Sequence, residues 1–293
     1  MKYLGWIFVF LWASGYIASS IGLSYTNPLT FITLRVIVAL FVFVIINFLI
    51  LRNNKVDNRS MVHAMIVGVF IQFLYPVFFS YSLVSGISPA MLTIVLGLQP
   101  VLTLIVSRDL NSKFQIYGVL GCVLGTLIFS VENFSLGTTN FENLILAILS
   151  LLGVTFGSIH QKKYCSNIPI EKNMLFQCFS ATLILLPTTI IFSEFKFDVN
   201  NISISALLWQ SLLISVLSSM LLIKALKSGT VTNVSTYFSC VPAATAVMAY
   251  IFFDSVITVN MMLGMFLIFG CTWLIQNQNW IDVFFENRAK QKA

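Results

Sequence analysis

The sequence predicts an all-α membrane protein with ten transmembrane helices, arranged as two inverted five-helix repeats around a central cavity. Three observations predict this class. First, 58% of the 293 residues are hydrophobic and only 9% are charged, whereas soluble domains carry about 25% charged residues. Second, the apolar residues form long runs of helix-spanning length. Third, two segments, one in each half of the chain, share the same order of features.

The apolar runs each contain about 20 residues and almost no charge, the length that crosses a bilayer as a helix. Backbone polar groups find no partners in lipid, so each run is predicted to be helical. The connections between runs are short and leave no room for a soluble domain. The predicted spans are 3–22, 29–51, 62–84, 90–107, 114–131, 144–161, 173–193, 206–226, 233–253 and 259–277.

The distribution of basic residues predicts the orientation. Ten spans place both termini on the same side of the membrane. If that side is the cytoplasm, only Lys196 of the sixteen Lys and Arg residues lies outside, and Arg35 lies within a span. This asymmetry follows the positive-inside rule. It predicts a multi-pass protein of the cell inner (plasma) membrane with cytoplasmic termini and the lipid bilayer as partner. The net charge of +6 is then a topology signal and not a sign of nucleic-acid binding.

Several classes of function have no support in the sequence. The five cysteines form no CxxC pair, and the two histidines have no neighbouring ligand pattern, so we expect no metal site. The chain has no GxSxG, Walker or HExxH motif, so we expect neither an enzyme nor a bound cofactor. The glycines Gly121 and Gly125 form a GxxxG motif that allows close helix approach. We expect its partner inside the bundle, although a homodimer is an alternative.

The two halves of the chain share a pattern. The segments Ser82–Asp109 and Ala225–Asp254 each contain a Ser-Gly turn, an apolar helix, a proline and a terminal aspartate. Because each half holds five spans, an odd number, the second half must be upside down relative to the first. We therefore predict a first repeat at 1–137 and a second, inverted repeat at 138–293. Inverted repeats are typical of secondary transporters, with the substrate near the midplane.

The chain resembles the EamA-type family of the drug/metabolite transporter superfamily. The resemblance rests on "LWASGYIASSIGL" in the first span, "PLTFITLR" in the second, "ISPAMLTIVLGLQPVLTLI" in the fourth, and "VPAATAVMAYIFFD" with "LGMFLIFGCTWLI" in the last two. It implies ten helices around a central cavity and transport of small metabolites, often amino acids. Members usually carry Glu after the fourth and ninth helices, where this chain has Asp109 and Asp254.

Polar and aromatic residues recur at helical spacing on single faces of several spans, which favours a cavity-facing position. For the serines, close helix packing is the alternative. For the two paired prolines, which break helix hydrogen bonds, the alternative is a simple kink. The candidate cavity and substrate-binding residues are Trp12, Tyr16, Arg35, Gln72, Tyr75, Phe79, Thr93, Pro100, Ser215, Ser239 and Pro242.

Arg35 lies about two turns, roughly 10 Å, inside the second span. A charge at the centre of a spanning helix costs roughly 2.5–3.5 kcal/mol. The side chain could extend outward to the interface. Alternatively, it could face the cavity, where its planar fork suits a substrate carboxylate or a backbone carbonyl at a gate. By resemblance, the family commonly holds Arg at this position.

The acidic residues all lie outside the central part of the spans. Proton-coupled carriers usually hold a carboxylate or histidine relay in the membrane. We therefore predict an exporter of a small metabolite, an amino acid or similar, working by alternating access as a uniporter or exchanger. The alternatives are a lipid or lipid-linked carrier translocase, an uptake or exchange carrier, and a non-transporting membrane subunit.

Overall fold

The computed structural model describes residues 2–50, 56–86, 92, 95–107, 113–130, 141–193, 195–253 and 257–277, and the part of the chain that it describes is almost entirely helical. The first half contains α1 (Lys2–Leu23), α2 (Pro28–Ile50), α3 (Asn58–Gly68), the π-helical segment η1 (Val69–Leu74), α4 (Tyr75–Val84), α6 (Gln99–Ser107) and α7 (Lys113–Ser130). The second half contains α8 (Phe141–Tyr164), α9 (Ile170–Phe192), α10 (Asn201–Leu208), the π-helical segment η3 (Trp209–Ser218), α11 (Ser219–Ser228), α12 (Val231–Phe253) and α13 (Val259–Gln276).

Six helical stretches of the described chain are long and apolar enough to cross a membrane. The segments α3, η1 and α4 form one such continuous stretch, and α10, η3 and α11 form another. The other four are α1, α2, α8 and α9, and shorter apolar helices lie at Val95–Ser107, Gln115–Phe129 and Val259–Ile275. The count of ten stays a prediction, because part of the fourth predicted span and the proposed repeat boundary at 137/138 lie outside the described residues.

The side-chain distribution fits a membrane environment. Phe48 is 80% exposed and Phe266 is 77% exposed, whereas the amide side chains of Gln72 and Gln177 are at most 2% exposed. In water this arrangement would expose apolar surface and bury polar groups. In lipid the apolar exterior is favourable, and the polar groups find partners only inside the bundle.

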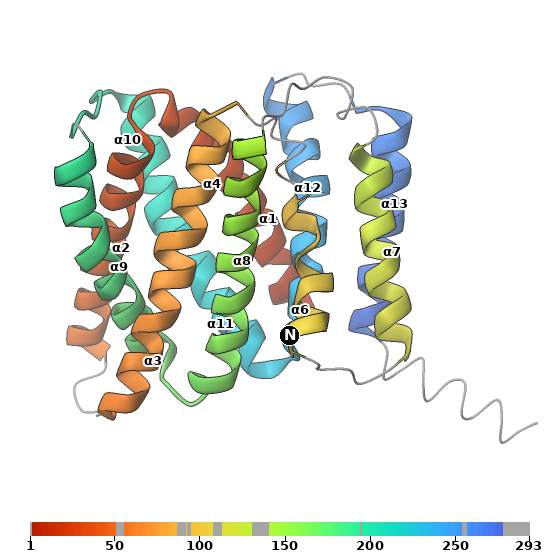
Figure 1. The fold of residues 1–293 in the computed structure, drawn as a ribbon, viewed down its shortest axis with the longest axis horizontal. Coiled ribbons are helices and arrows are strands. Elements are labelled where there is room, and N and C mark those ends of the chain that lie inside the picture. The colour runs from red at the N-terminus through yellow and green to blue at the C-terminus, as the bar shows by residue number, and fades with distance from the viewer. Residues whose placement is uncertain are drawn as a thin grey trace, which may run out of the picture.

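Helices at equivalent places in the two halves run in opposite directions. In Figure 1 the stretch from α3 to α4 rises, while the stretch from α10 to α11 descends. We call the side on which α1 begins the near side, at the bottom of Figure 1, and the opposite side the far side. The near side is the one that the sequence predicts to be cytoplasmic.

The helix contacts keep the same pattern when the two halves are exchanged. Three contacts join equivalent helices: α2 with α9, α6 with α12, and α7 with α13. The other contacts occur in matching pairs. The α1–α12 contact matches α6–α8, and the packing of α1 on η3 matches that of α8 on η1. Such a pattern is that of two repeats related by a two-fold axis.

The helix caps show the same relation. Asp57 precedes α3 and accepts a hydrogen bond from the backbone N–H of Ser60, and Asn200 precedes α10 and accepts one from Ser203. The two caps are 143 positions apart, as are the two serines. Such caps satisfy the free N–H groups of a helix start. At the first cap the hydrogen bonds from Ser60 lower the pKa of the Asp57 carboxyl.

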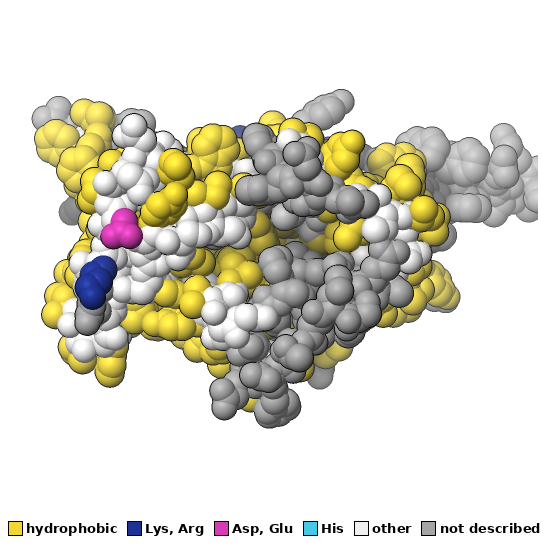
Figure 2. Space-filling view, turned by 90° about the horizontal axis from the view of Figure 1, so that it is seen from above, with side chains coloured by type: hydrophobic (Ala, Val, Ile, Leu, Met, Phe, Trp, Pro, Cys, Tyr) yellow, Lys and Arg dark blue, Asp and Glu magenta, His cyan; other side chains and the backbone are white. Residues whose placement is uncertain are grey.

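On the far side, the α1–α2 connection is tied to the α9–α10 connection. Thr26 donates from Oγ1 to the carbonyl of Lys196 at 2.6 Å, and Asp198 donates from its backbone N–H to the carbonyl of Tyr25 at 3.1 Å. Just below them, the hydroxyls of Thr33 and Thr189 are 2.6 Å apart across α2 and α9. Figure 2 shows that the described part of this face carries little charge.

Glycines bring α7 and α13 into backbone contact. A Cβ on Gly264 would lie 2.6 Å from the carbonyl oxygen of Gly125, and one on Gly125 would lie 3.0 Å from that of Gly264. A Cβ on Gly121 would overlap the sulfur of Cys271. The GxxxG motif therefore packs inside the bundle, as expected.

We expect Gly264→Ala to destabilise the chain by about 1–3 kcal/mol, because its new methyl group overlaps backbone that cannot move aside. Gly270→Ala, in the same helix, is the matched control, because a Cβ there meets nothing within 4 Å. It should be stabilising by about 0.5–1 kcal/mol, since alanine favours a helix. Thermal unfolding in detergent measures both. Equal melting temperatures for the two variants would contradict the α7–α13 contact.

Candidate functional site

A polar cavity lies between α1, α2, the η1–α4 stretch and the η3–α11 stretch. Its volume of about 30 Å³ is room for one or two water molecules. Both halves of the chain contribute walls. Seven of the residues that the sequence predicts for a cavity line it, namely Trp12, Tyr16, Arg35, Gln72, Tyr75, Phe79 and Ser215.

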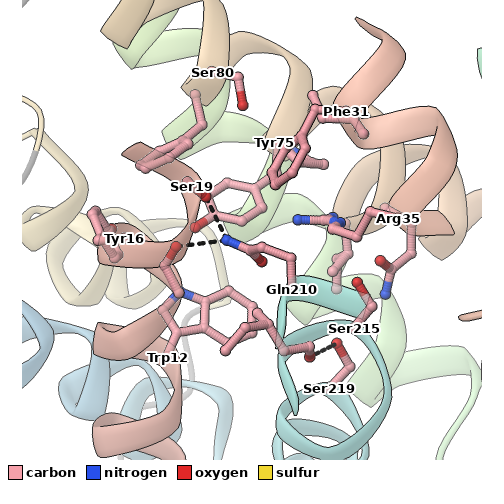
Figure 3. A pocket seen from close by; sticks show the side chains of 17 residues that line it. Trp12, Tyr16, Ser19, Phe31, Arg35, Tyr75, Ser80, Gln210, Ser215 and Ser219 are labelled. Carbon is pink, nitrogen blue, oxygen red and sulfur yellow. Dashed lines mark hydrogen bonds between the residues drawn. The ribbon is translucent and has the colours of Figure 1, made fainter. Parts of the chain in front are cut away.

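Arg35 comes from α2, seven residues after the first residue Pro28, or about 10 Å from the far end of the helix. In Figure 3 its guanidinium points from α2 into the space between Tyr75 and Gln210, and not along the helix toward the surface. Its Nε is buried and has no hydrogen-bond partner among the described residues. A cation thus lines the cavity with one buried donor, Nε, left without a partner among the described residues.

The two π-helical segments present polar side chains at equivalent positions. Gln72 lies in η1 and Ser215 lies in η3, again 143 positions apart. Both are 2% exposed, and neither Gln72 Nε2 nor Ser215 Oγ has a hydrogen-bond partner in the part of the chain described. Each lies 14 residues from the start of its stretch, roughly 21 Å along the axis and close to mid-membrane.

Pro76 gives a local reason for the first π segment. Proline has no N–H and its ring crowds the carbonyl four residues earlier, here that of Gln72. The backbone widens, and Tyr75 donates its N–H to the carbonyl of Phe70, five residues back. The Tyr75 carbonyl in turn accepts a hydrogen bond from Ser150 Oγ on α8 at 3.0 Å. Such single-turn π segments often occur at functional sites.

Aromatic side chains of α1 and α4 form one wall of the cavity. Trp12 and Tyr75 are stacked with ring centroids 5.9 Å apart, and Tyr16 meets Phe79 edge-on at 5.0 Å. Trp12 also contacts Phe238 of α12 edge-on at 5.4 Å. These contacts fix the rings, because offset-stacked and edge-on pairs are the favoured geometries.

Gln210 lines the cavity and is not among the predicted residues. Its Nε2 donates to the Gly15 carbonyl at 2.6 Å and to Ser19 Oγ, as Figure 3 shows. Its Oε1 has no partner within the described residues, so it offers the cavity an acceptor. The sequence feature that could have identified Gln210 is an amide within a predicted span. It directly precedes Ser211, the first of the serines that recur at helical spacing in that span. The other lining residues absent from the predicted set are Gly15, Ser19, Phe31, Ile32, Ile71, Pro76, Ser80, Ile214 and Ser219.

Three predicted residues lie elsewhere. Pro100 is the second residue of α6 and Pro242 lies inside α12, and both are buried in this pair of packed helices. Ser239 of α12 donates from Oγ to the carbonyl of Gly97, two residues before α6, at 3.4 Å. Its hydroxyl therefore also connects α12 to this part of the chain. None of the three lines the cavity, and their role in substrate binding stays a prediction. Thr93 lies outside the described residues.

Among the described residues, no acidic side chain lines the cavity. The histidines also lie apart from it. His63 Nδ1 and His160 Nε2 are 3.1 Å apart, which joins α3 to α8 toward the near side, and the ring of Tyr164 stacks on His63. The described residues contain no group of three or more His, Cys, Asp or Glu side chains placed to hold a metal ion.

The described lining of the cavity therefore offers more unpartnered hydrogen-bond donors than acceptors. Its free donors come from a guanidinium, an amide nitrogen and a hydroxyl, and its free acceptor is the amide oxygen of Gln210. Buried donors without partners are costly, by about 1–3 kcal/mol each. A group that accepts several hydrogen bonds, such as a carboxylate, would satisfy them.

Comparisons with known proteins agree with the two-repeat architecture. The model of the EamA-like transporter family matches residues 3–131 and, a second time, residues 143–276. A solved structure titled "Crystal structure of protein" has the same fold, with a TM-score of 0.77 and 16% sequence identity. The match covers 94% of this chain and 96% of that one. A comparison with curated proteins finds no match. Because the two family matches cover most of its length, the chain belongs to the EamA-like transporter family, a family of multi-pass membrane transporters.

Proposed function

We propose that this protein exports a small metabolite that carries a carboxylate, an amino acid or a similar compound, by alternating access as a uniporter or exchanger. The observation that carries the proposal is the cavity itself. It lies within the membrane-spanning helices, both repeats form its walls, and Arg35, Gln72 and Ser215 each present to it a donor without a partner among the described residues.

The size of the cavity supports a mechanism that changes shape. Its volume of about 30 Å³ is far below the roughly 300–1,000 Å³ of ordinary ligand sites. A metabolite therefore needs α1, α2 and the π-helical stretches to separate. The π segments are suited to this, because they are already irregular turns within otherwise regular helices.

Counterflow in proteoliposomes tests the proposal. The purified protein is preloaded with an unlabelled mixture of amino acids and other small carboxylates, and uptake of each labelled compound is followed. We expect exchange of at least one zwitterionic or anionic compound. Exchange of cationic compounds alone would contradict the assignment, because the described lining of the cavity contains Arg35 and no acidic side chain.

A second candidate is a translocase for lipids or lipid-linked carriers. It is favoured by a groove of about 470 Å³ between α1, α10 and α12, with mainly apolar walls that include Ile17, Ile202 and Met248. Trp209 donates from Nε1 to Ser14 Oγ at 2.9 Å where the groove meets η3. Movement of a fluorescent lipid across the liposome bilayer, without any metabolite exchange, would favour this candidate.

Arg35 is expected to hold the carboxylate. Arg35→Gln should raise the half-saturation concentration at least tenfold, because a hydrogen bond to a charged group contributes about 1.5–3 kcal/mol. Arg35→Lys keeps the charge without the planar fork and should lose less. Initial exchange rates, normalised to folded protein, measure both variants. Arg59→Gln, on an exposed residue at the start of α3, is the control. Wild-type kinetics in Arg35→Gln would contradict the assignment.

Transport should not depend on a pH gradient. The described acidic side chains lie at helix ends and in connections, and the His63–His160 pair is outside the cavity. The initial rate down a substrate gradient should therefore be the same with and without an imposed pH gradient. A rate that falls when the gradient is collapsed, and falls likewise in His63→Gln or His160→Gln, would show that the pair carries protons.

A further inference from the structure

A second buried polar cluster lies where α3, α8 and α9 meet, on the near side of the cavity. Gln177 on α9 donates from Nε2 to Oε1 of Gln161 on α8 and to Oδ1 of Asn173, both at 3.0 Å. All three side chains are at most 1% exposed. The amide nitrogens of Gln161 and Asn173 have no hydrogen-bond partner among the described residues. We call these three residues the near cluster.

The near cluster is about one helical turn from the cavity. At Gly68 the backbone of α3 touches α9 so closely that a Cβ would overlap the carbonyl oxygen of Gln177. Ser180 Oγ of α9 also donates to the carbonyl of Met65 at 2.8 Å. Gln72, which lines the cavity, follows four residues after Gly68, roughly 6 Å along the stretch. A single turn of the α3–η1 stretch, from Gly68 to Gln72, thus connects the two polar sites.

Gln177 occupies the place in the second repeat that Arg35 occupies in the first. Arg35 is seven residues after Pro28, the first residue of α2, and Gln177 is seven residues after Ile170, the first residue of α9. The neighbours correspond as well, because α2 packs on η3 while α9 packs on α3 and η1. Since the repeats run in opposite directions, Arg35 lies about 10 Å from the far end and Gln177 about 10 Å from the near end.

Both sites contain buried hydrogen-bond donors that have no partner among the described residues. In the cavity, Arg35 Nε and Gln72 Nε2 are donors without partners, and in the near cluster the same is true of Gln161 Nε2 and Asn173 Nδ2. Ser158, one turn before Gln161 on α8, adds a buried hydroxyl without a partner. Both sites are therefore short of hydrogen-bond acceptors.

We propose that the near cluster is the near half of the substrate path, and that its amides bind the same carboxylate-like group when the near side opens. In this structure it is closed, because the hydrogen bond from Gln177 to Gln161 joins α9 to α8, and the bond to Asn173 within α9 uses the other N–H of Gln177. Opening frees Gln177 Nε2 to join Gln161 and Asn173 as ligands. The inference rests on the proposed transport function and assigns Gln177 as a specificity-determining residue of the near-side-open state.

Side-specific kinetics test this assignment. Gln177→Met keeps the length of the side chain and removes its hydrogen bonds. In proteoliposomes in which one orientation is blocked, it should raise the half-saturation concentration about tenfold from the near side. From the far side the change should be less than twofold, and Arg35→Gln should show the opposite asymmetry. The matched control is Gln115→Met, another buried glutamine bonded to an asparagine, Asn233, outside both sites. Equal effects of Gln177→Met on both sides, or none, would overturn the proposal.

A labelling experiment needs no substrate. Ser158→Cys is introduced after the five native cysteines are replaced by alanine. A membrane-impermeant thiol reagent should modify it from the near side and not from the far side. Absence of near-side modification in folded protein would overturn the near-half assignment even if transport is found. Near-side modification without transport of any metabolite would support the conclusion that the near side opens at this cluster, and it would refute the proposed transport function.

Discussion

The hydrocarbon core of a membrane offers no hydrogen-bond partner, and this constraint governs the whole architecture. Backbone groups are satisfied within helices, and polar side chains are stable only where other polar groups or a ligand meet them inside the bundle. The exterior of this chain is accordingly apolar, with Phe48 and Phe266 largely exposed, while its amides and hydroxyls are buried. Arg35 brings a charge into this interior, where its Nε is buried without a partner among the described residues, and it lines the cavity.

The same constraint explains where the structure is rigid and where it is irregular. Between α7 and α13 glycines allow backbone contact, and Cys122 of α7 adds a hydrogen bond to the Thr272 hydroxyl of α13. Around the cavity, in contrast, two helices contain π-helical turns, and several donors have no partner. Packing is therefore tight at the α7–α13 contact, away from the cavity, and incompletely satisfied along the proposed path. Incomplete satisfaction favours binding, because a ligand with acceptor groups supplies the missing bonds.

The two-fold relation between the repeats gives this arrangement a mechanistic meaning. A far site built around Arg35 and a near cluster built around Gln177 are equivalent by position but differ in state. The first encloses a small cavity, and in the second the side chains bond to one another. A carrier with this geometry can exchange the two states by moving one repeat against the other. The difference between a guanidinium and an amide would then make the two sides unequal in affinity.

Composition and run length were enough to predict a multi-pass helical membrane protein, and the repeated pattern of turns and prolines was enough to predict two inverted repeats. Helical spacing also identified six of the side chains that line the cavity, and a charge within an apolar span identified the seventh, Arg35. Both signals work because polar groups of a spanning helix are stable facing the bundle interior. The same spacing could not separate them from Ser239, Pro100 and Pro242, since a buried hydroxyl or a kink also serves helix packing.

Gln210 and the near cluster were beyond the sequence for a related reason. An amide in a spanning helix has the same local pattern whether it faces a cavity or bonds to a neighbouring helix. The bonds of Gln210 to α1 cross more than 190 positions, and that of Gln177 to Gln161 joins two helices. The sequence by itself determined which segments enter the membrane, because hydrophobicity is a local property. Only the tertiary structure decided which polar groups meet, because hydrogen bonding depends on distances between segments that are remote in the chain.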